Sequence, residues 1–237
     1  MGANPLEPFP EDWSRALGVV AHPDDLEYGA ASAVARWTEQ GKDVRYLLVT
    51  RGEAGISTMP PAEVGPLREE EERRSARAVG VSVVEFLDHA DGLVEADLRL
   101  RRDLSEAIRR HQPEVILSIN HRDSWGGQSW NQADHRAVGR ALLDAVRDAA
   151  NPWVFPEAGP AWGGVRLAAF NASPVATHAV DVTGYVGRGI ESLLCHELYL
   201  ANLGGDDDPG KFLRASAQSV GERLGVSDAV AFELVTF

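Results

Sequence analysis

The stretch from Leu17 to Gly29 constrains this chain more than any other part of its sequence. It starts as an apolar run of strand length and continues into His22-Pro23-Asp24-Asp25. The proline stiffens the turn and keeps the residue before it extended. The pattern therefore predicts a strand that gives way to a helix. Loops at strand ends line the ligand crevice of α/β sheets, and His with Asp suits a divalent cation such as zinc.

The same residues also allow a purely structural interpretation. The proline could set a turn and an aspartate could cap the next helix, while His22 is simply exposed. A second segment, Asn131–Arg136, favours a metal site because it also lies where a strand has ended and a helix begins. If the two loops share one edge of a sheet, His22, Asp25 and His135 can meet at a single ion. Three protein ligands with a fourth position left for water are typical of catalytic zinc.

Composition narrows the class of protein further. The 237 residues suffice for one substantial core, and the net charge of −13 argues against nucleic acid or an anionic membrane as partner. A neutral or weakly charged small molecule fits better as substrate. The single cysteine, Cys195, excludes an internal disulfide framework and thiolate-rich zinc sites. We expect a cytoplasmic protein, because we find neither a signal-like segment nor a bilayer-spanning apolar run.

Strands and helices alternate along the chain. The predicted strands are 17–21, 44–50, 83–87, 115–119, 166–171 and 178–182, and the predicted helices are 27–40, 67–79, 97–111, 134–150 and 185 to about 203. Residues 1–14 are expected to form an irregular lead-in to one domain, 15–237. The alternation predicts an α/β fold: a Rossmann-like, mostly parallel sheet flanked by helices. The first turn lacks the Gly-x-Gly-x-x-Gly fingerprint, so dinucleotide binding has little support.

Three motifs add a resemblance to a known family. Ala21–Glu27 (AHPDDLE), Thr50–Gly55 (TRGEAG) and Ala133–Gly139 (ADHRAVG), in this order and spacing, resemble the PIG-L/LmbE-like family of zinc-dependent de-N-acetylases. Members of that family remove acetyl groups from N-acetylated sugars with one zinc-like ion. The resemblance implies a hydrolase that removes an N-acetyl group from an N-acetylglucosaminyl-type amino sugar or its conjugate.

The resemblance also implies roles for individual residues. His22, Asp25 and His135 become the ligands of one Zn²⁺ per chain, and Asp24 becomes the general base. This assignment agrees with the chemistry, because a cation acidifies its water and polarises an amide carbonyl, so that a neighbouring carboxylate can take the proton. Asp134 is expected to orient its neighbours by hydrogen bonding.

One position departs from the family pattern. Members often have His-Pro-Asp-His in the second motif, whereas this chain has Gln132 in place of the first of those histidines. A glutamine amide can donate a hydrogen bond to an oxyanion but cannot deliver a proton. Either Asp24 returns the proton that it took, or another group such as His196 or His121 enters the site, or activity is weak or absent.

Five residues are candidates for contacts with the substrate. Arg68 resembles the family's substrate-facing arginine, although a surface salt bridge with a neighbouring glutamate on its own helix explains it as well. Arg51 is an alternative for the same task, and His196 resembles a family position in a late helix. Trp125 and Trp130 flank a Gly-Gly pair beside the second motif, where aromatic faces could stack on a sugar or simply pack in the core.

Several functions remain open on these residues. The first alternatives are a same-fold amidase acting on another acyl group, and a protein that binds metal and ligand without turnover because of Gln132. Substrate choice would depend on the predicted loops 52–66, 121–131 and 151–164. Divalent ions other than zinc fit the same ligands. The family resemblance also allows a homo-oligomer.

Overall fold

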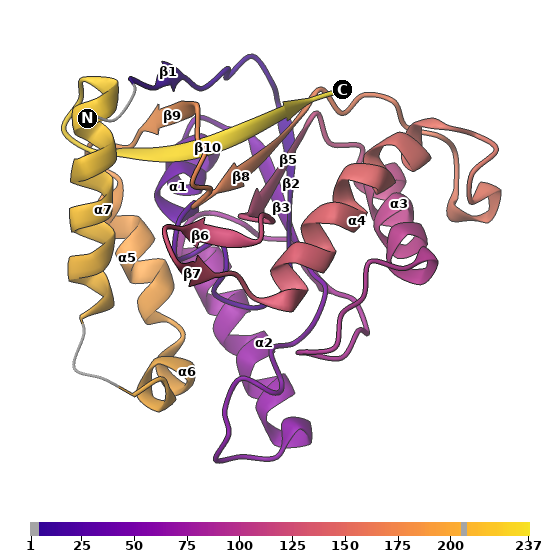
Figure 1. Ribbon diagram of the computed structural model, residues 1–237, viewed down its shortest axis with the longest axis horizontal. Helices are drawn as coiled ribbons and strands as arrows, with labels where there is room; N and C mark the ends of the chain where they lie inside the picture. Colours follow the sequence, from indigo (N-terminus) through magenta and orange to yellow (C-terminus); the bar gives the residue numbers. More distant parts are fainter. Residues whose placement is uncertain (1–4, 205–207) are drawn as a thin grey trace.

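The computed structural model describes residues 5–204 and 208–237, and an eight-stranded mixed sheet lies at its centre (Figure 1). Its strand order is β1-β9-β10-β8-β5-β2-β3-β4. The five neighbours from β8 to β4 run parallel, and β10 pairs antiparallel with both β8 and β9. The strands of this sheet are β1 (Glu7–Pro8), β2 (Arg15–Val20), β3 (Asp43–Leu48), β4 (Val84–Phe86), β5 (Val115–Ile119), β8 (Leu167–Asn171), β9 (His178–Asp181) and β10 (Ala229–Thr236). The predicted α/β fold with a mostly parallel sheet is confirmed.

Helices cover both faces of the sheet and bury one apolar layer on each side. They are α1 (Ala31–Glu39), α2 (Pro61–Ala78), α3 (Leu98–His111), α4 (Ala133–Ala150), α5 (Val186–Leu194), α6 (Glu197–Asn202) and α7 (Pro209–Leu224). One core cluster joins the sheet to α1, α2, α5 and α7, and a second joins its other face to α3 and α4. Because central strands such as β5 are buried on both faces, they appear in the sequence as continuous apolar runs.

Three predicted helices need correction. The first starts at Ala31 instead of 27, because residues 23–30 form turns around Asp24, whose φ is +102°. The second starts at Pro61 instead of 67, so only 52–60 of the predicted loop is non-helical. Pro61 is tolerated because the first helical position needs no N–H. The third predicted helix breaks at Cys195-His196 into α5 and α6. Glu71 of α2 caps the start of α6, because its buried carboxylate accepts the N–H of Leu198 over 2.5 Å.

Several elements lie outside the predictions. The loop 121–130 contains a hairpin of β6 (Ser124–Gly126) and β7 (Ser129–Trp130), and the C-terminal part adds α7 and β10. The sequence pattern of β10 is interrupted by a charged residue, Glu233, so the strand was not predicted. Glu233 can be buried there because Arg122 and Ser173 donate hydrogen bonds to its carboxylate. In the predicted lead-in, residues 1–4 lie outside the described part of the chain, and β1 pairs with β9.

Candidate metal centre and catalytic cavity

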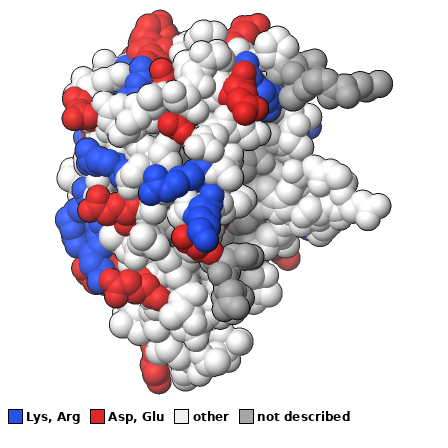
Figure 2. All heavy atoms as spheres, turned by 90° about the vertical axis from the view of Figure 1, so that its left-hand side faces the viewer, with Lys and Arg blue, Asp and Glu red and all other residues white. Residues whose placement is uncertain are grey.

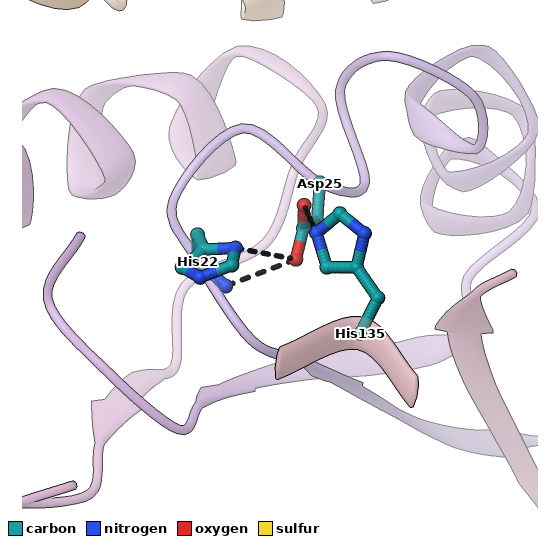
Figure 3. A group of neighbouring side chains, drawn as sticks. All are labelled: His22, Asp25 and His135. Carbon is teal, nitrogen blue, oxygen red and sulfur yellow. Dashed lines mark hydrogen bonds and ion pairs between the residues drawn. The ribbon is translucent and has the colours of Figure 1, made fainter. Parts of the chain in front are cut away.

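Three parallel strands bring the candidate ligands and Asp91 to one edge of the sheet. His22 follows β2 directly, Asp91 lies in the loop after β4, and His135 lies in the first turn of α4, which follows β5 and the hairpin. Carboxyl ends of parallel strands share one edge, so residues far apart in the sequence become neighbours. Figure 3 shows Asp25 between the two imidazoles, with all three side chains directed toward one another.

The three predicted ligands form a compact and buried group. Nε2 of His135 lies 3.0 Å from Oδ1 of Asp25, and Nδ1 of His22 lies 3.6 Å from its Oδ2. Each residue offers one ligand atom, and these three atoms lie within 4.8 Å of one another. Each of the three residues is at most 9 % exposed. Such spacing between nitrogen and oxygen donors suits a divalent cation bound at about 2.0–2.2 Å.

The hydrogen bonds of His135 support a metal-binding role. Its Nδ1 lies 3.0 Å from Oδ1 of Asn131, whose Nδ2 donates to two backbone carbonyls and fixes the amide. Nδ1 therefore donates to Asn131, and Nε2 is the ring atom that faces Asp25, at 3.0 Å. A cation bound between Nε2 and Asp25 would take the place of this ion pair, so the donor set fits a cation at this position.

Asp134 and Asp91 both contact Nε2 of His22, the ring nitrogen that does not face Asp25. Nε2 of His22 lies 3.2 Å from Asp134 and 3.0 Å from Asp91, and Asp134 also accepts the N–H groups of Gly92 and Val94. Burial alone would lower the pKa of His22, but Asp25, Asp134 and Asp91 outweigh it and hold that pKa well above its usual value. With Nε2 tied to carboxylates, Nδ1 is the atom that faces Asp25 and is available to a cation.

Asp25 and Asp24 are adjacent but differ in electrostatic environment. Burial would raise the pKa of Asp25, but the two imidazoles dominate and lower it. For Asp24, burial is the largest effect and raises the pKa to about 6, although Arg68 opposes it. Asp24 also has a φ of +102°, a conformation that costs a non-glycine residue about 1–3 kcal/mol and is typically found at functional sites.

Arg68 stabilises this strained turn from α2. Its guanidinium donates to the carbonyl of Pro23, to the carbonyl of Gly52 over 3.2 Å and to Oδ1 of Asp24 over 3.1 Å. Gly52 has a φ of +62°, and a Cβ there would lie 2.2 Å from Nη1 of Arg68, so only glycine allows this approach. Arg68 is only 2 % exposed, so the alternative of a surface salt bridge on its own helix is wrong.

A cavity of about 310 Å³ opens above the candidate metal group. Its lining includes Asp91, Tyr28 and Tyr199 together with seven predicted site residues: His22, Asp24, Asp25, Arg68, Trp125, Gln132 and His135. The ring centre of Trp125 lies 5.6 Å from that of His135.

The remaining candidates do not lie at this cavity. Trp130 is 68 % exposed under the guanidinium of Arg136, and Arg51 pairs with Glu69 and Asp88. His196 has no exposed surface, so the prediction that it contacts substrate requires correction: the break between α5 and α6 turns it into the interior. Asp134, also with no exposed surface, orients His22 and does not face the cavity.

Three lining residues with polar or charged side chains were missed by the sequence analysis. Asp91 follows a predicted strand and precedes a glycine, a signal that could have placed it at the same sheet edge. Tyr28 and Tyr199 offered no comparable signal. Tyr199 reaches the site only because the late helix breaks, and its ring centre then lies 3.9 Å from the guanidinium carbon of Arg68.

Replacing Asn131 tests how His135 is oriented. We expect Asn131→Ala to weaken zinc binding by about 10- to 100-fold, because the imidazole loses the acceptor that fixes its tautomer. Competition with a chromophoric chelator measures the affinity. Asn131→Asp keeps an acceptor for His135 but loses the two hydrogen bonds to the carbonyls of Asn120 and Arg122, so its affinity should lie between those of the alanine variant and the wild type. Equal affinity of the alanine variant and the wild type would contradict this role.

Fold and site together define an α/β protein with a candidate cation centre at the carboxyl edge of its parallel strands. The family model described as PIG-L: GlcNAc-PI de-N-acetylase matches residues 17–146, more than half of the sequence. The chain therefore belongs to the PIG-L family, and the predicted family resemblance is confirmed.

Individual relatives agree with this assignment. The diacetylchitobiose deacetylase of Thermococcus kodakarensis is 32 % identical over 148 residues, which are 62 % of this chain and 54 % of that protein. The 4-oxalmesaconate hydratase of Pseudomonas putida is 35 % identical over 117 residues, 46 % of this chain and 45 % of its own. The chain thus spans about half the length of these curated relatives. An N,N'-diacetylchitobiose deacetylase structure from Pyrococcus horikoshii shares the fold, with a TM-score of 0.84, 23 % identity and coverage of 95 % and 85 %.

Proposed function

We propose that the chain is a zinc-dependent de-N-acetylase that hydrolyses the N-acetyl group of an N-acetylglucosamine-type amino sugar or its conjugate. The observation that supports this most is the meeting of His22, Asp25 and His135 beside the Asp24 carboxylate in one cavity. Membership of the PIG-L family and the deacetylases among the relatives support the same reaction.

The proposed roles follow from the positions of the side chains. His22, Asp25 and His135 hold the ion, which when bound supplies Lewis acidity toward the amide carbonyl and acidifies water. Asp24 accepts a proton from the attacking water, while the guanidinium of Arg68 holds its other side and fixes its orientation.

Gln132 restricts how the leaving amine receives its proton. Its amide lines the cavity and can donate a hydrogen bond to the developing oxyanion, but it holds no transferable proton. His196 and His121 are not among the residues that line the described cavity. We therefore assign the return of the proton to Asp24, whose carboxylate lines the cavity beside the candidate metal group.

Trp125 is the proposed stacking platform for the sugar. We expect Trp125→Ala to raise KM by roughly 3- to 10-fold, because an aromatic face contributes about 0.5–1.5 kcal/mol beyond its buried area. Trp130→Ala should leave KM unchanged, since its ring lies outside the cavity. Initial rates over a range of substrate concentrations measure both values, and zinc content shows whether His135 still binds metal. Equal effects of the two substitutions would argue against stacking on Trp125.

Acetate release tests the function directly. We expect acetate from a panel of N-acetylglucosamine conjugates with zinc-loaded protein and none after chelation, with activity restored by zinc. Manganese and iron reconstitution tests the zinc assignment. Acetate release that survives complete removal of metal would contradict the proposal. Metal-loaded protein that is inactive on N-acetyl sugars but cleaves another acyl group would favour the amidase alternative, and binding without turnover would favour a metal- and ligand-binding protein.

A hydratase is the second candidate, because one relative is a 4-oxalmesaconate hydratase at 35 % identity. Membership of the PIG-L family and the deacetylases among the relatives favour the deacetylase. Conversion of 4-oxalmesaconate by the zinc-loaded chain, without acetate release from any sugar, would reverse this order.

The surface bears on the predicted partners. On the face drawn in Figure 2, acidic and basic side chains form small separate groups with uncharged surface between them. A small-molecule substrate fits the amino-sugar substrates in the relatives' names, and the absence of a nucleic-acid partner stays a prediction. None of the described helices is long and apolar enough to cross a membrane. A cytoplasmic location and a homo-oligomer stay predictions.

A further inference from the structure

A second group of ionisable side chains lies beneath the Asp24 turn. Glu27 belongs to the turn before α1, Glu72 to α2, and His196 to the break between α5 and α6. Their exposed fractions are 2 %, 1 % and 0 %, and one ligand atom from each lies within 4.8 Å of the other two. In the described structure none of them lines the catalytic cavity.

Several polar atoms of this group lack partners. Nε2 of His196 is 3.7 Å from Oε2 of Glu72 and 4.0 Å from Oε1 of Glu27, too far for hydrogen bonds. Both ring nitrogens of His196, Oε2 of Glu72 and the hydroxyl of fully buried Tyr46 make no hydrogen bond to any part of the chain that is described. Leaving a buried polar group without a partner costs about 1–3 kcal/mol. A bound ion or water between these groups would remove that cost.

Charge favours a cation as that occupant. Glu27 and Glu72 approach each other in the interior, and each is at most 2 % exposed. The nearest fixed cation, Arg68, is already bonded to Asp24 and to two carbonyls. Ser75 donates only to Glu27, over 2.7 Å, and brings no positive charge. The imidazole of His196 can supply at most one positive charge beside these two carboxylates, so a divalent cation would complete the charge balance.

The donors resemble those of the first group in type and spacing. Neighbouring ligand atoms there lie 3.0 and 3.6 Å apart, against 3.7 and 4.0 Å here, so inward shifts of a few tenths of an ångström would allow coordination. Glu27 also lines a separate cavity of about 220 Å³ between Tyr28 and α7, which gives an ion a route from the surface.

We propose that Glu27, Glu72 and His196 bind a second divalent cation of the zinc type. Because its three ligands are buried and come from three separate elements, this ion would tie α2 and the α5–α6 break to the turn that carries Asp24. The first centre binds its ion at the cavity and serves the proposed reaction, whereas the second needs no substrate to be detected.

Metal counting on the full chain tests this inference independently of activity. After loading with zinc and removal of excess by gel filtration, we expect two ions per wild-type chain. His196→Gln and Glu72→Gln should each lower the count to one, and His135→Gln should remove the other ion. His121→Gln is the matched control, because it removes another half-buried imidazole outside both groups, and it should retain two ions.

Anomalous scattering at the zinc edge from wild-type crystals decides the case without any variant. Two peaks, one within each group, are expected. A single peak at His22, Asp25 and His135, with a water or nothing among Glu27, Glu72 and His196, would overturn the proposal, as would a wild-type count of one that His196→Gln leaves unchanged. An inactive protein with two ions would refute the proposed reaction and leave the second site standing.

Discussion

Asp24→Asn is expected to lower the rate of acetate release by about 10²- to 10⁴-fold while the zinc content stays at its wild-type value. The variant keeps an oxygen that can accept the hydrogen bond from Arg68 but has no carboxylate to take the proton from water. Since Asp24 is not among the proposed ligands, its loss should affect turnover and not metal affinity. Steady-state rates and metal analysis of the same preparation measure the two effects.

Stability provides the control for this variant. In the metal-free protein the pKa of Asp24 is raised from 3.8 to about 6, mainly by burial, so the folded state binds a proton more readily than the unfolded state. The stability that this provides is full below about pH 3.8 and is lost as the pH rises through about 6. Neutral asparagine removes the buried charge. At pH 7, and with metal removed by a chelator, the variant should therefore be at least as stable to unfolding as the wild type. Wild-type turnover by Asp24→Asn would exclude Asp24 as the base.

The fold could be predicted where the sequence signal is local. The strand Val115–Ile119 was predicted with its observed bounds, because a run buried on both faces needs no partner to be recognised. His22, Asp25 and His135 could be proposed together because each follows a recognisable strand or starts a recognisable helix. The local pattern did not predict β10, because Glu233 lies within that strand. Its burial depends on an ion pair with Arg122, which comes from a loop distant in sequence.

The rest of the site depends on contacts between segments remote in sequence. His196 was expected beside the substrate because it resembles a family position in a late helix. The structure instead starts a new helix there, which Glu71 caps, and the imidazole is turned inward. Asp91 reaches His22 only once β4 is placed beside β3. Arg68 lies within a run of charged residues that suggests a solvated surface, and only the packing of α2 on the Asp24 turn buries it.

Arg68→Leu is expected to destabilise the protein by about 3–5 kcal/mol and to abolish most activity. The substitution leaves the buried carboxylate of Asp24 unpaired and removes the donor to the carbonyls of Pro23 and Gly52. It also removes the cation that stacks on Tyr199. Without these contacts nothing offsets the backbone strain at Asp24, so the proposed base loses its orientation. Urea unfolding with linear extrapolation measures the change in the free energy of unfolding.

Arg51→Leu is the matched control, because both arginines were candidates for the same contact with substrate. Arg51 is paired at the surface with Glu69 and Asp88, and such pairs contribute about 0–1 kcal/mol, so its loss should be small. Arg68→Lys keeps the charge but not the planar fork that reaches three acceptors, and should lie between the leucine variant and the wild type. A leucine variant as stable as Arg51→Leu, with only KM increased, would mean that Arg68 binds substrate and does not support the turn.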